Sequence, residues 1–363
     1  GMHFFNPPVI MRLVEVVRGV QTDEETINIT MDLARKMGKQ PVLVKKDVPG
    51  FIVNRIVSRV LNTACWLVAR GKASIEMVDA ALKYKLGFSM GAFELLDYSG
   101  IDIFYSIFKV MLERGFKIHM CPLLEEKFKA GEYGVKSGKG FYTYPELGKY
   151  VKPEIPKELS DKVDPLIILA PAVNEATWLL SENVASLEDI DKACKLGLGY
   201  PRGIFEYADE YGIDAIVSML ENLLKESSWE EYIPHPTLKM MVAEGKLGRE
   251  TGKGLIGMGK AKEIILTGDM ISASDALKIG LVNRVVPPEK LESEVRSFAL
   301  KLAEKPPLAL ATAKYAIQSG YETVINTGLH LESTLFGLIF STKDAKEGLK
   351  AFFEKRKPKF KGE

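Results

Sequence analysis

Cysteine is scarce in this sequence, with three among 363 residues. Cys65, Cys121 and Cys194 are widely spaced and odd in number. This usage argues against a disulfide framework and favours buried thiols in a reducing compartment. We therefore expect a cytoplasmic protein. Histidine is scarce as well, and the four histidines lack the spacing of metal ligands, so no metal site is expected.

An excess of one charge and long apolar runs are also missing. The 49 basic and 48 acidic residues leave a formal net charge of +1, which provides no global field for nucleic acid or a membrane surface. No apolar run approaches the roughly 18 residues of a membrane span, and no secretory signal opens the sequence. The apolar content of 46% indicates an ordinary globular chain with material for two or more cores.

The sequence also lacks a dinucleotide-binding loop in its usual context, between a buried strand and a helix. The segment Gly252–Gly257 formally satisfies Gly-x-Gly-x-x-Gly. However, Met240–Thr251 before it predicts a helix end and a polar turn instead of a buried strand, and no acidic residue follows at the expected distance. We therefore expect no nucleotide binding there.

The most informative feature that is present is a histidine and a glutamate twelve residues apart, His3 and Glu15. The alternation across Leu13–Val17 predicts a strand, and the preceding turn at Pro7-Pro8 could fold the Glu15 carboxylate back toward His3. An imidazole oriented by a carboxylate is a general base suited to neutral pH. For an arbitrary pair at this spacing, a turn histidine and a strand-end glutamate would be the ordinary interpretation.

The surrounding strings favour the functional interpretation. Gly1-Met2-His3-Phe4-Phe5-Asn6-Pro7 followed by Leu13–Val17, and then Pro49-Gly50-Phe51-Ile52-Val53-Asn54-Arg55, strongly resemble the 3-hydroxyacyl-CoA dehydrogenase family. The resemblance implies that His3 takes the proton of the 3-hydroxyl while hydride passes from C3 to NAD, and that Glu15 orients His3. It also implies that Asn54 and Asn6 contact the substrate, an acyl-CoA thioester. For Asn54 the alternative is a hydrogen bond at a helix N-terminus.

The same resemblance draws attention to what the sequence does not contain. The family binds NAD on an N-terminal Rossmann unit whose glycine-rich loop would precede Gly1, and its serine near the substrate carbonyl has no counterpart here. We expect either that the sequence is an incomplete record of a longer polypeptide or that it is a truncated product.

An internal repeat organises the middle of the chain. Residues from Asn62 to Asp102 recur 112 positions later, from Asn174 to Asp214, including Asn-x-Ala-x-Trp-Leu and Gly-x-Phe-Glu. Each copy predicts a long amphipathic helix and a second helix capped by Ser74 or Ser186. The repeated acids most simply serve as helix caps, because both copies keep them while only one adjoins His3; they are Glu94, Asp97, Glu206 and Asp209.

The segment from Leu255 to Glu363 resembles the C-terminal third of the crotonase superfamily, the enoyl-CoA hydratases. The match rests on Ser272–Pro287, Asp344–Gly348 and Glu354–Pro358. It implies that Phe336 and Lys355 contact the adenine and phosphates of CoA; the alternatives are a core phenylalanine and a lysine in a solvated tail. The catalytic glutamates and the oxyanion hole of that family have no counterpart, so hydration of an enoyl-CoA is not expected.

Together these observations predict a mainly α fold. We expect a Rossmann-type α/β remnant over 1–47, two helical dehydrogenase copies over 48–150 (copy 1) and 151–254 (copy 2), and a helical crotonase tail over 255–363. The secondary structure is expected to include strands at 13–17 and 40–45 and helices at 23–37, 288–305 and 307–319.

Three hypotheses for function follow. The first is an NAD-dependent 3-hydroxyacyl-CoA dehydrogenase of fatty-acyl or hydroxybutyryl-CoA metabolism, fused to an enoyl-CoA hydratase segment, with homo-oligomers expected from the family. The second is a non-catalytic module for acyl-CoA binding or oligomerisation, which detectable CoA binding without NADH oxidation would favour. The third is a fragment with no function of its own, which poor solubility would indicate.

Overall fold

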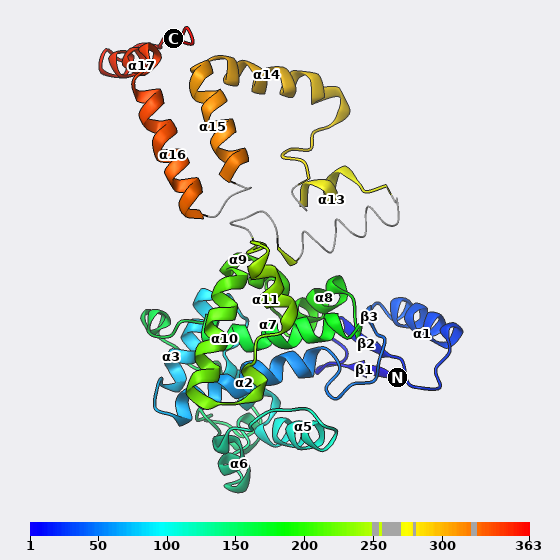
Figure 1. The fold of residues 1–363 in the computed structure, drawn as a ribbon. Coiled ribbons are helices and arrows are strands. Elements are labelled where there is room, and N and C mark those ends of the chain that lie inside the picture. Colours follow the sequence, from blue (N-terminus) through cyan, green and yellow to red (C-terminus); the bar gives the residue numbers. More distant parts are fainter. Residues whose placement is uncertain (249–253, 256–269, 279–280, 321–324) are drawn as a thin grey trace. The chain divides into compact units, whose positions relative to one another are not determined.

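The computed structural model describes residues 1–248, 254–255, 270–278, 281–320 and 325–363 (Figure 1). Two compact units make up the chain, Gly1–Gly259 and Lys260–Glu363. Most of the glycine pattern at 252–257, from which no nucleotide binding is expected, lies outside the described residues.

A three-stranded sheet opens the first unit. Strand β1 (Met2–Phe4) pairs antiparallel with β2 (Leu13–Val17), and β2 pairs parallel with β3 (Gln40–Val44) through the crossover helix α1 (Glu24–Lys36). All five residues of β2 are buried, as expected for the central strand of a sheet covered on both faces. The predicted strands and the predicted helix are confirmed to within one residue at each end.

Within the described residues of the first unit, ten α-helices in two sets follow the sheet. The helices of copy 1 are α2 (Val53–Ala69), α3 (Ile75–Ala80), α4 (Ala92–Ser99), α5 (Ile101–Glu113) and α6 (Pro122–Lys129). Those of copy 2 are α7 (Leu166–Ser181), α8 (Leu187–Gly197), α9 (Ile204–Tyr211), α10 (Ile213–Ser227) and α11 (Pro236–Ala243). Shorter helical segments are Ala81–Lys85, Val135–Ser137, Lys157–Lys162 and Glu230–Tyr232.

The two sets repeat the same local devices. Ser74 Oγ accepts a hydrogen bond from the Met77 amide and Ser186 Oγ from the Asp189 amide, at 3.2 and 3.1 Å, so both predicted caps are confirmed. Helix α10 has 15 residues where α5 has 13. This difference moves the later part of copy 2 out of the 112-residue register by two residues.

The repeated carboxylates serve packing, as the duplication predicts, but in two ways. Glu94 and Glu206 accept hydrogen bonds from the Gly91 and Gly203 amides at the starts of α4 and α9, at 3.3 and 2.9 Å. Asp97 instead accepts from the Phe141 amide at 2.9 Å and so holds the glycine-rich turn after α6. The capping interpretation is therefore right for the glutamates, whereas Asp97 holds a turn.

One hydrophobic core joins the sheet to both copies. Helices α2 and α7 occupy equivalent positions in the repeat, and they make the most extensive contact among the described helix pairs. The core cluster includes Leu13 of β2, Leu61 of α2 and Val173 of α7, all fully buried. Because the copies share this core, neither has an apolar interior of its own.

The second unit is helical. Its helices are α13 (Ala273–Lys278), α14 (Leu291–Ala303), α15 (Pro307–Gly320), α16 (Ile325–Phe340) and α17 (Lys343–Phe353). The helix predicted over 288–305 is divided into a 3₁₀ turn at Pro288–Lys290 and α14. The mainly α fold is confirmed, and within the described residues no helix combines the length and apolarity needed to cross a bilayer.

Candidate functional site

The His3–Glu15 pair is produced by the register of two strands. The two residues lie directly opposite each other in the β1–β2 ladder, so their side chains project from the same face of the sheet. His3 Nδ1 lies 2.6 Å from Glu15 Oε2. The imidazole keeps 31% of its surface exposed while the carboxylate is fully buried. A buried acceptor thus holds a histidine that can still reach a ligand.

The second oxygen of Glu15 is bound by the start of α2. Its Oε1 accepts hydrogen bonds from the amides of Ile52 and Val53, both at 3.0 Å. Free amides and the positive end of the helix dipole at this terminus both favour a carboxylate. Glu15 therefore has its orientation fixed from two directions, by the sheet on one side and by α2 on the other.

The turn that leads into α2 is conformationally unusual. Gly50 has φ 79° and Phe51 has φ 50°, a left-handed conformation that an aromatic residue rarely adopts. A Cβ on Gly50 would lie 2.5 Å from the end of the flexible Met111 side chain, so the positive φ is the stronger reason for glycine at this position. The Phe51 ring packs 5.5 Å from the His3 ring, and Phe5 lies edge-on at 4.7 Å. These two rings form apolar walls beside the imidazole.

The hydrogen bond to Glu15 selects the tautomer of His3. When Nδ1–H donates to the carboxylate, Nε2 carries the lone pair. Among the described residues, no hydrogen bond occupies Nε2. This nitrogen can therefore accept a proton from a ligand, and the buried carboxylate would stabilise the resulting imidazolium.

The two predicted asparagine contacts differ in placement. Asn54 is half-buried in the first turn of α2, one residue after the Val53 amide that binds Glu15. The alternative role, a hydrogen bond capping the helix, is not found in the described structure, where the N-cap residue is Ile52. Asn6 is exposed just beyond β1, and no described hydrogen bond joins it to the His3–Glu15 pair.

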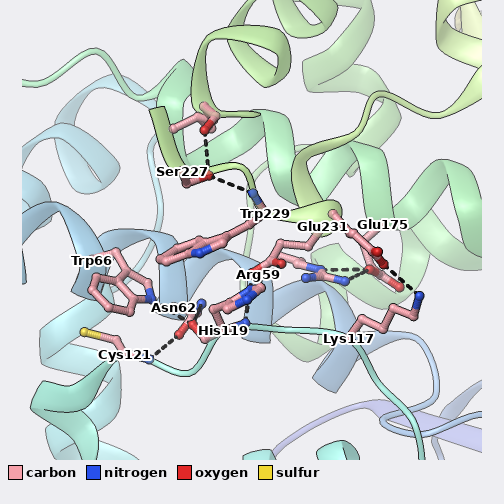
Figure 2. Close-up of polar contacts among 12 residues, drawn as sticks. Arg59, Asn62, Trp66, Lys117, His119, Cys121, Glu175, Ser227, Trp229 and Glu231 are labelled. Carbon is pink, nitrogen blue, oxygen red and sulfur yellow. Dashed lines mark hydrogen bonds and ion pairs between the residues drawn. The ribbon is translucent and has the colours of Figure 1, made fainter. Parts of the chain in front are cut away.

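A second histidine–carboxylate pair, which the sequence analysis did not predict, lies beside the later residues of α2. His119 Nδ1 is 2.7 Å from Glu231 Oε2, and the imidazole stacks on Trp229 with centroids 4.5 Å apart (Figure 2). Asn62 and Trp66 of α2 both donate to the His119 carbonyl. The partners come from different copies, so no local pattern could have revealed the pair. Its contacts tie the two copies together.

Burial raises the pKa of two thiols and of one carboxyl group in the repeat. All three cysteines are buried and free of disulfides, and burial raises the pKa of Cys65 and Cys194 well above the ordinary range. These two thiols are therefore poor nucleophiles. Burial also raises the pKa of Asp79 to about 7, although the Phe93 and Glu94 amides oppose the shift. Asp79 belongs to α3, and its carboxyl group accepts hydrogen bonds from both amides in the first turn of α4.

The predicted CoA contacts belong to the second unit. Phe336 on α16 is 64% exposed, so the core interpretation of this residue is wrong. Its ring lies 4.9 Å from that of Phe340. Lys355 follows α17 with φ 52° and is exposed. No described contact joins Phe336 to Lys355.

Three family models match the chain. "3-hydroxyacyl-CoA dehydrogenase, C-terminal domain" matches residues 50–144 and 167–257, one stretch for each copy. "3-hydroxyacyl-CoA dehydrogenase, NAD binding domain" matches 1–48, and "Enoyl-CoA hydratase/isomerase" matches 235–363.

Named relatives agree with these models. The chain is 36% identical over 265 residues to the fatty acid oxidation complex subunit alpha of Idiomarina loihiensis, which covers 68% of this chain and 36% of the relative. The Vibrio cholerae protein of the same name is 36% identical over 248 residues, covering 64% and 34%. The chain thus spans about a third of the length of these relatives.

A solved structure shares the fold. The 3-hydroxybutyryl-CoA dehydrogenase of Escherichia coli K12 superposes with a TM-score of 0.59 at 26% identity, covering 67% of this chain and 70% of that one.

Proposed function

The chain belongs to the 3-hydroxyacyl-CoA dehydrogenase family, and we propose that its His3–Glu15 pair is the general base of an NAD-dependent oxidation of 3-hydroxyacyl-CoA to 3-oxoacyl-CoA. The observation that carries the proposal is the 2.6 Å contact between a partly exposed imidazole and a buried carboxylate held at the start of α2. The match of the enoyl-CoA hydratase model to 235–363 supports a fusion of the two activities in the longer proteins related to this chain.

The protein groups account for the movement of the proton. His3 Nε2 removes the proton of the 3-hydroxyl group, and the charge that forms on the imidazole is stabilised by Glu15 through Nδ1. In this proposal Asn54 hydrogen-bonds a polar group of the substrate; its position one residue beyond the Val53 amide and its partial exposure support this role. Because two helix amides fix Glu15, the base needs little reorganisation during the reaction.

NAD is proposed as the hydride acceptor from the match of residues 1–48 to the NAD-binding domain. The described residues do not themselves fit the dinucleotide: after β2 the chain continues Arg18-Gly19-Val20-Gln21, which is not a Gly-x-Gly-x-x-Gly turn, and α1 begins at Glu24. We therefore assign only the proton transfer to residues of this chain.

The test is the oxidation of NADH that depends on acetoacetyl-CoA, measured for the purified chain. His3→Gln should lower kcat about 10²- to 10⁴-fold, the usual loss when a general base is removed. The matched control is His119→Gln, which removes the other histidine paired with a buried glutamate and should leave kcat within about twofold. Absence of acetoacetyl-CoA-dependent NADH oxidation in the unaltered chain, or an equal loss in both variants, would contradict the proposal.

A second candidate function is acyl-CoA binding without turnover, supported by the exposed Phe336 ring and the exposed Lys355 ammonium. Calorimetry with CoA should then show binding that Phe336→Ala and Lys355→Ala each weaken. Lys357→Ala is the control, because Lys357 is also exposed near the end of the chain. Equal affinity in all variants would remove these two residues from the proposal.

Two further properties are proposed from the family and from the thiols. The buried, unpaired cysteines support a cytoplasmic location. Self-association into homo-oligomers is expected from the family, and the mass of the purified chain in solution, compared with 40.3 kDa, tests it.

A further inference from the structure

A buried cluster of three charges joins the two copies beside the candidate site. Arg55 Nε lies 2.6 Å from Glu175 Oε1, and Arg59 Nε lies 2.8 Å from Glu175 Oε2. Both arginines belong to α2 in copy 1, whereas Glu175 belongs to α7 in copy 2. The side chains are only 9%, 8% and 5% exposed (Arg59 and Glu175 in Figure 2).

Stability alone does not explain this cluster. It places two cations and one anion in the interior, and Arg59 Nη1 has no hydrogen-bond partner within the described structure. Burial lowers the pKa of Arg55, a sign of the desolvation that the charged form undergoes. Buried ion pairs can often be replaced by apolar side chains without loss of stability. Their better supported use is to specify one arrangement of the surrounding elements.

Arg55 has two contacts that Arg59 lacks. Its Nη1 donates to the Pro49 carbonyl at 3.3 Å, and its guanidinium lies over the Trp178 ring, 4.1 Å from the centroid. Both guanidinium groups lie over the Phe116 ring, at 4.7 Å for Arg55 and 4.4 Å for Arg59. Pro49 begins the turn that contains the left-handed residues Gly50 and Phe51. Such a conformation persists only when its surroundings hold it.

The same turn ends at the amides that bind Glu15. A continuous series of contacts therefore runs from Glu175 to Arg55, to the Pro49 carbonyl, and through the turn to the Ile52 and Val53 amides. From these amides it continues to Glu15 and His3. Every step is a hydrogen bond or a stretch of at most four residues.

We propose that Arg55, held in place by Glu175 of copy 2, is a positioning residue for the His3–Glu15 pair. Copy 2 thereby acts on the His3–Glu15 pair, although both residues of the pair lie in the sheet that precedes the copies. The proposal rests on the proposed function for its catalytic meaning, but the geometry that it concerns can be measured without catalysis.

The experiment compares two variants of the same cluster, Arg55→Met and Arg59→Met. Each removes one cation from the same helix and leaves one arginine paired with Glu175, but only the first removes the contact with Pro49. The readout is the proton resonance of His3 Nδ1–H in NMR spectra of the intact chain, assigned with His3→Gln, because this proton lies in the hydrogen bond to Glu15. Glu15→Gln provides the reference for complete loss of the carboxylate.

Loss of positioning lengthens the hydrogen bond from His3 Nδ1–H to Glu15 and so moves the Nδ1–H resonance upfield. Arg55→Met should move this resonance upfield, in the direction of Glu15→Gln. Arg59→Met should leave it unchanged. Equal shifts in both variants, or no shift in Arg55→Met, overturn the proposal. If Arg55→Met does not fold, Arg55→Lys replaces it, since one ammonium lacks the planar fork that binds Glu175 and Pro49 together.

The contribution of copy 2 is tested with Glu175→Gln in the Arg59→Met background. This double variant removes one cation and one anion, so the cluster has the same net charge as in the unaltered chain. It should shift the His3 Nδ1–H resonance in the same direction as Arg55→Met. Glu231→Gln, which breaks a different carboxylate contact between the copies, should not. A His3 Nδ1–H resonance that responds equally to both substitutions would mean a general loosening of the copies and would overturn the role of Glu175.

The two proposals fail in different ways. A chain that does not oxidise NADH but shows the selective shift in Arg55→Met contradicts the proposed function and keeps the positioning role. A chain that oxidises NADH but shows no selective shift supports the proposed function and contradicts the positioning role of Arg55.

Discussion

At the scale of single residues, the site depends on strand register and on close approaches. His3 and Glu15 face each other because they are partners in the β1–β2 ladder, and a slip of one residue would send them to opposite faces of the sheet. Gly197, at the end of α8, touches the same region: a Cβ there would lie 2.7 Å from Leu13 Cδ2 and 3.1 Å from Val53 Cγ2.

Gly197→Ala is expected to destabilise the first unit by about 1–3 kcal/mol, because the added methyl group meets the strand and the helix that hold Glu15. Gly337→Ala is the matched substitution, on helix α16 with no atom within 4 Å of the added Cβ. It should stabilise its helix by up to about 1 kcal/mol, through the higher helix propensity of alanine. Urea denaturation measures both effects. If both substitutions changed the free energy of unfolding in the same direction, this explanation would be contradicted.

Asp79 should make stability depend on pH. Burial raises its pKa in the folded state to about 7 from 3.8, so between these values the folded protein retains a proton that the unfolded chain releases. The resulting stabilisation is complete below pH 3.8 and is lost as the pH rises through about 7. Over this range the free energy of unfolding should fall by up to about 4 kcal/mol.

This dependence is isolated by comparing variants at pH 5 and pH 8. Asp79→Asn cannot release the proton, so the difference between the two pH values should shrink relative to the unaltered chain. Asp161→Asn is the control, because the Asp161 side chain is 82% exposed. An unaltered pH dependence in Asp79→Asn would show that Asp79 is not the responsible group.

At the scale of elements, α2 combines several tasks along 17 residues. Its first amides bind Glu15, its first turn carries Asn54, and its next turns carry the arginines that meet Glu175. Farther along, Asn62 and Trp66 hold the His119 carbonyl. A single rigid helix therefore connects the candidate site to the contacts between the copies.

The capping serines allow an element-level prediction. Ser186→Ala should cost about 1 kcal/mol of stability, since the Asp189 amide would lose its acceptor at the start of α8. Ser106→Ala is the comparison on α5, where the exposed hydroxyl only donates back to the Asp102 carbonyl. That change should stay within about 0.5 kcal/mol. The denaturant midpoints of the two variants test this prediction. Equal midpoints would exclude a capping role for Ser186.

At the scale of the whole first unit, the shared core predicts joint unfolding of both copies. Phe205 of copy 2 is fully buried, and Phe205→Ala should cost about 3–5 kcal/mol. Because α2 and α7 pack on each other, this loss should lower hydrogen-exchange protection equally in α2 and α7. Ile233 is 51% exposed, so Ile233→Ala should change the hydrogen-exchange protection of neither α2 nor α7. Loss of protection confined to copy 2 would show that the copies unfold independently.

Local patterns in the sequence determined most of the secondary structure and the family. Alternating apolar residues predicted β2, serines before acidic turns predicted the caps at Ser74 and Ser186, and the repeat predicted two equivalent sets of helices. These features depend on neighbours within a few residues, so the sequence displays them directly. The strings around His3 and Asn54 likewise predicted that His3 is a general base and that Glu15 orients it, roles that stay predictions.

Only the tertiary structure decided which distant groups meet. The strand register brought Glu15 to His3, and the start of α2 supplied the two amides that hold Glu15. Arg55 and Glu175 stand 120 residues apart, and His119 and Glu231 stand 112 apart. Such pairs form because two copies fold around one core, and the packing of that core, not any local propensity, sets which polar groups are buried side by side.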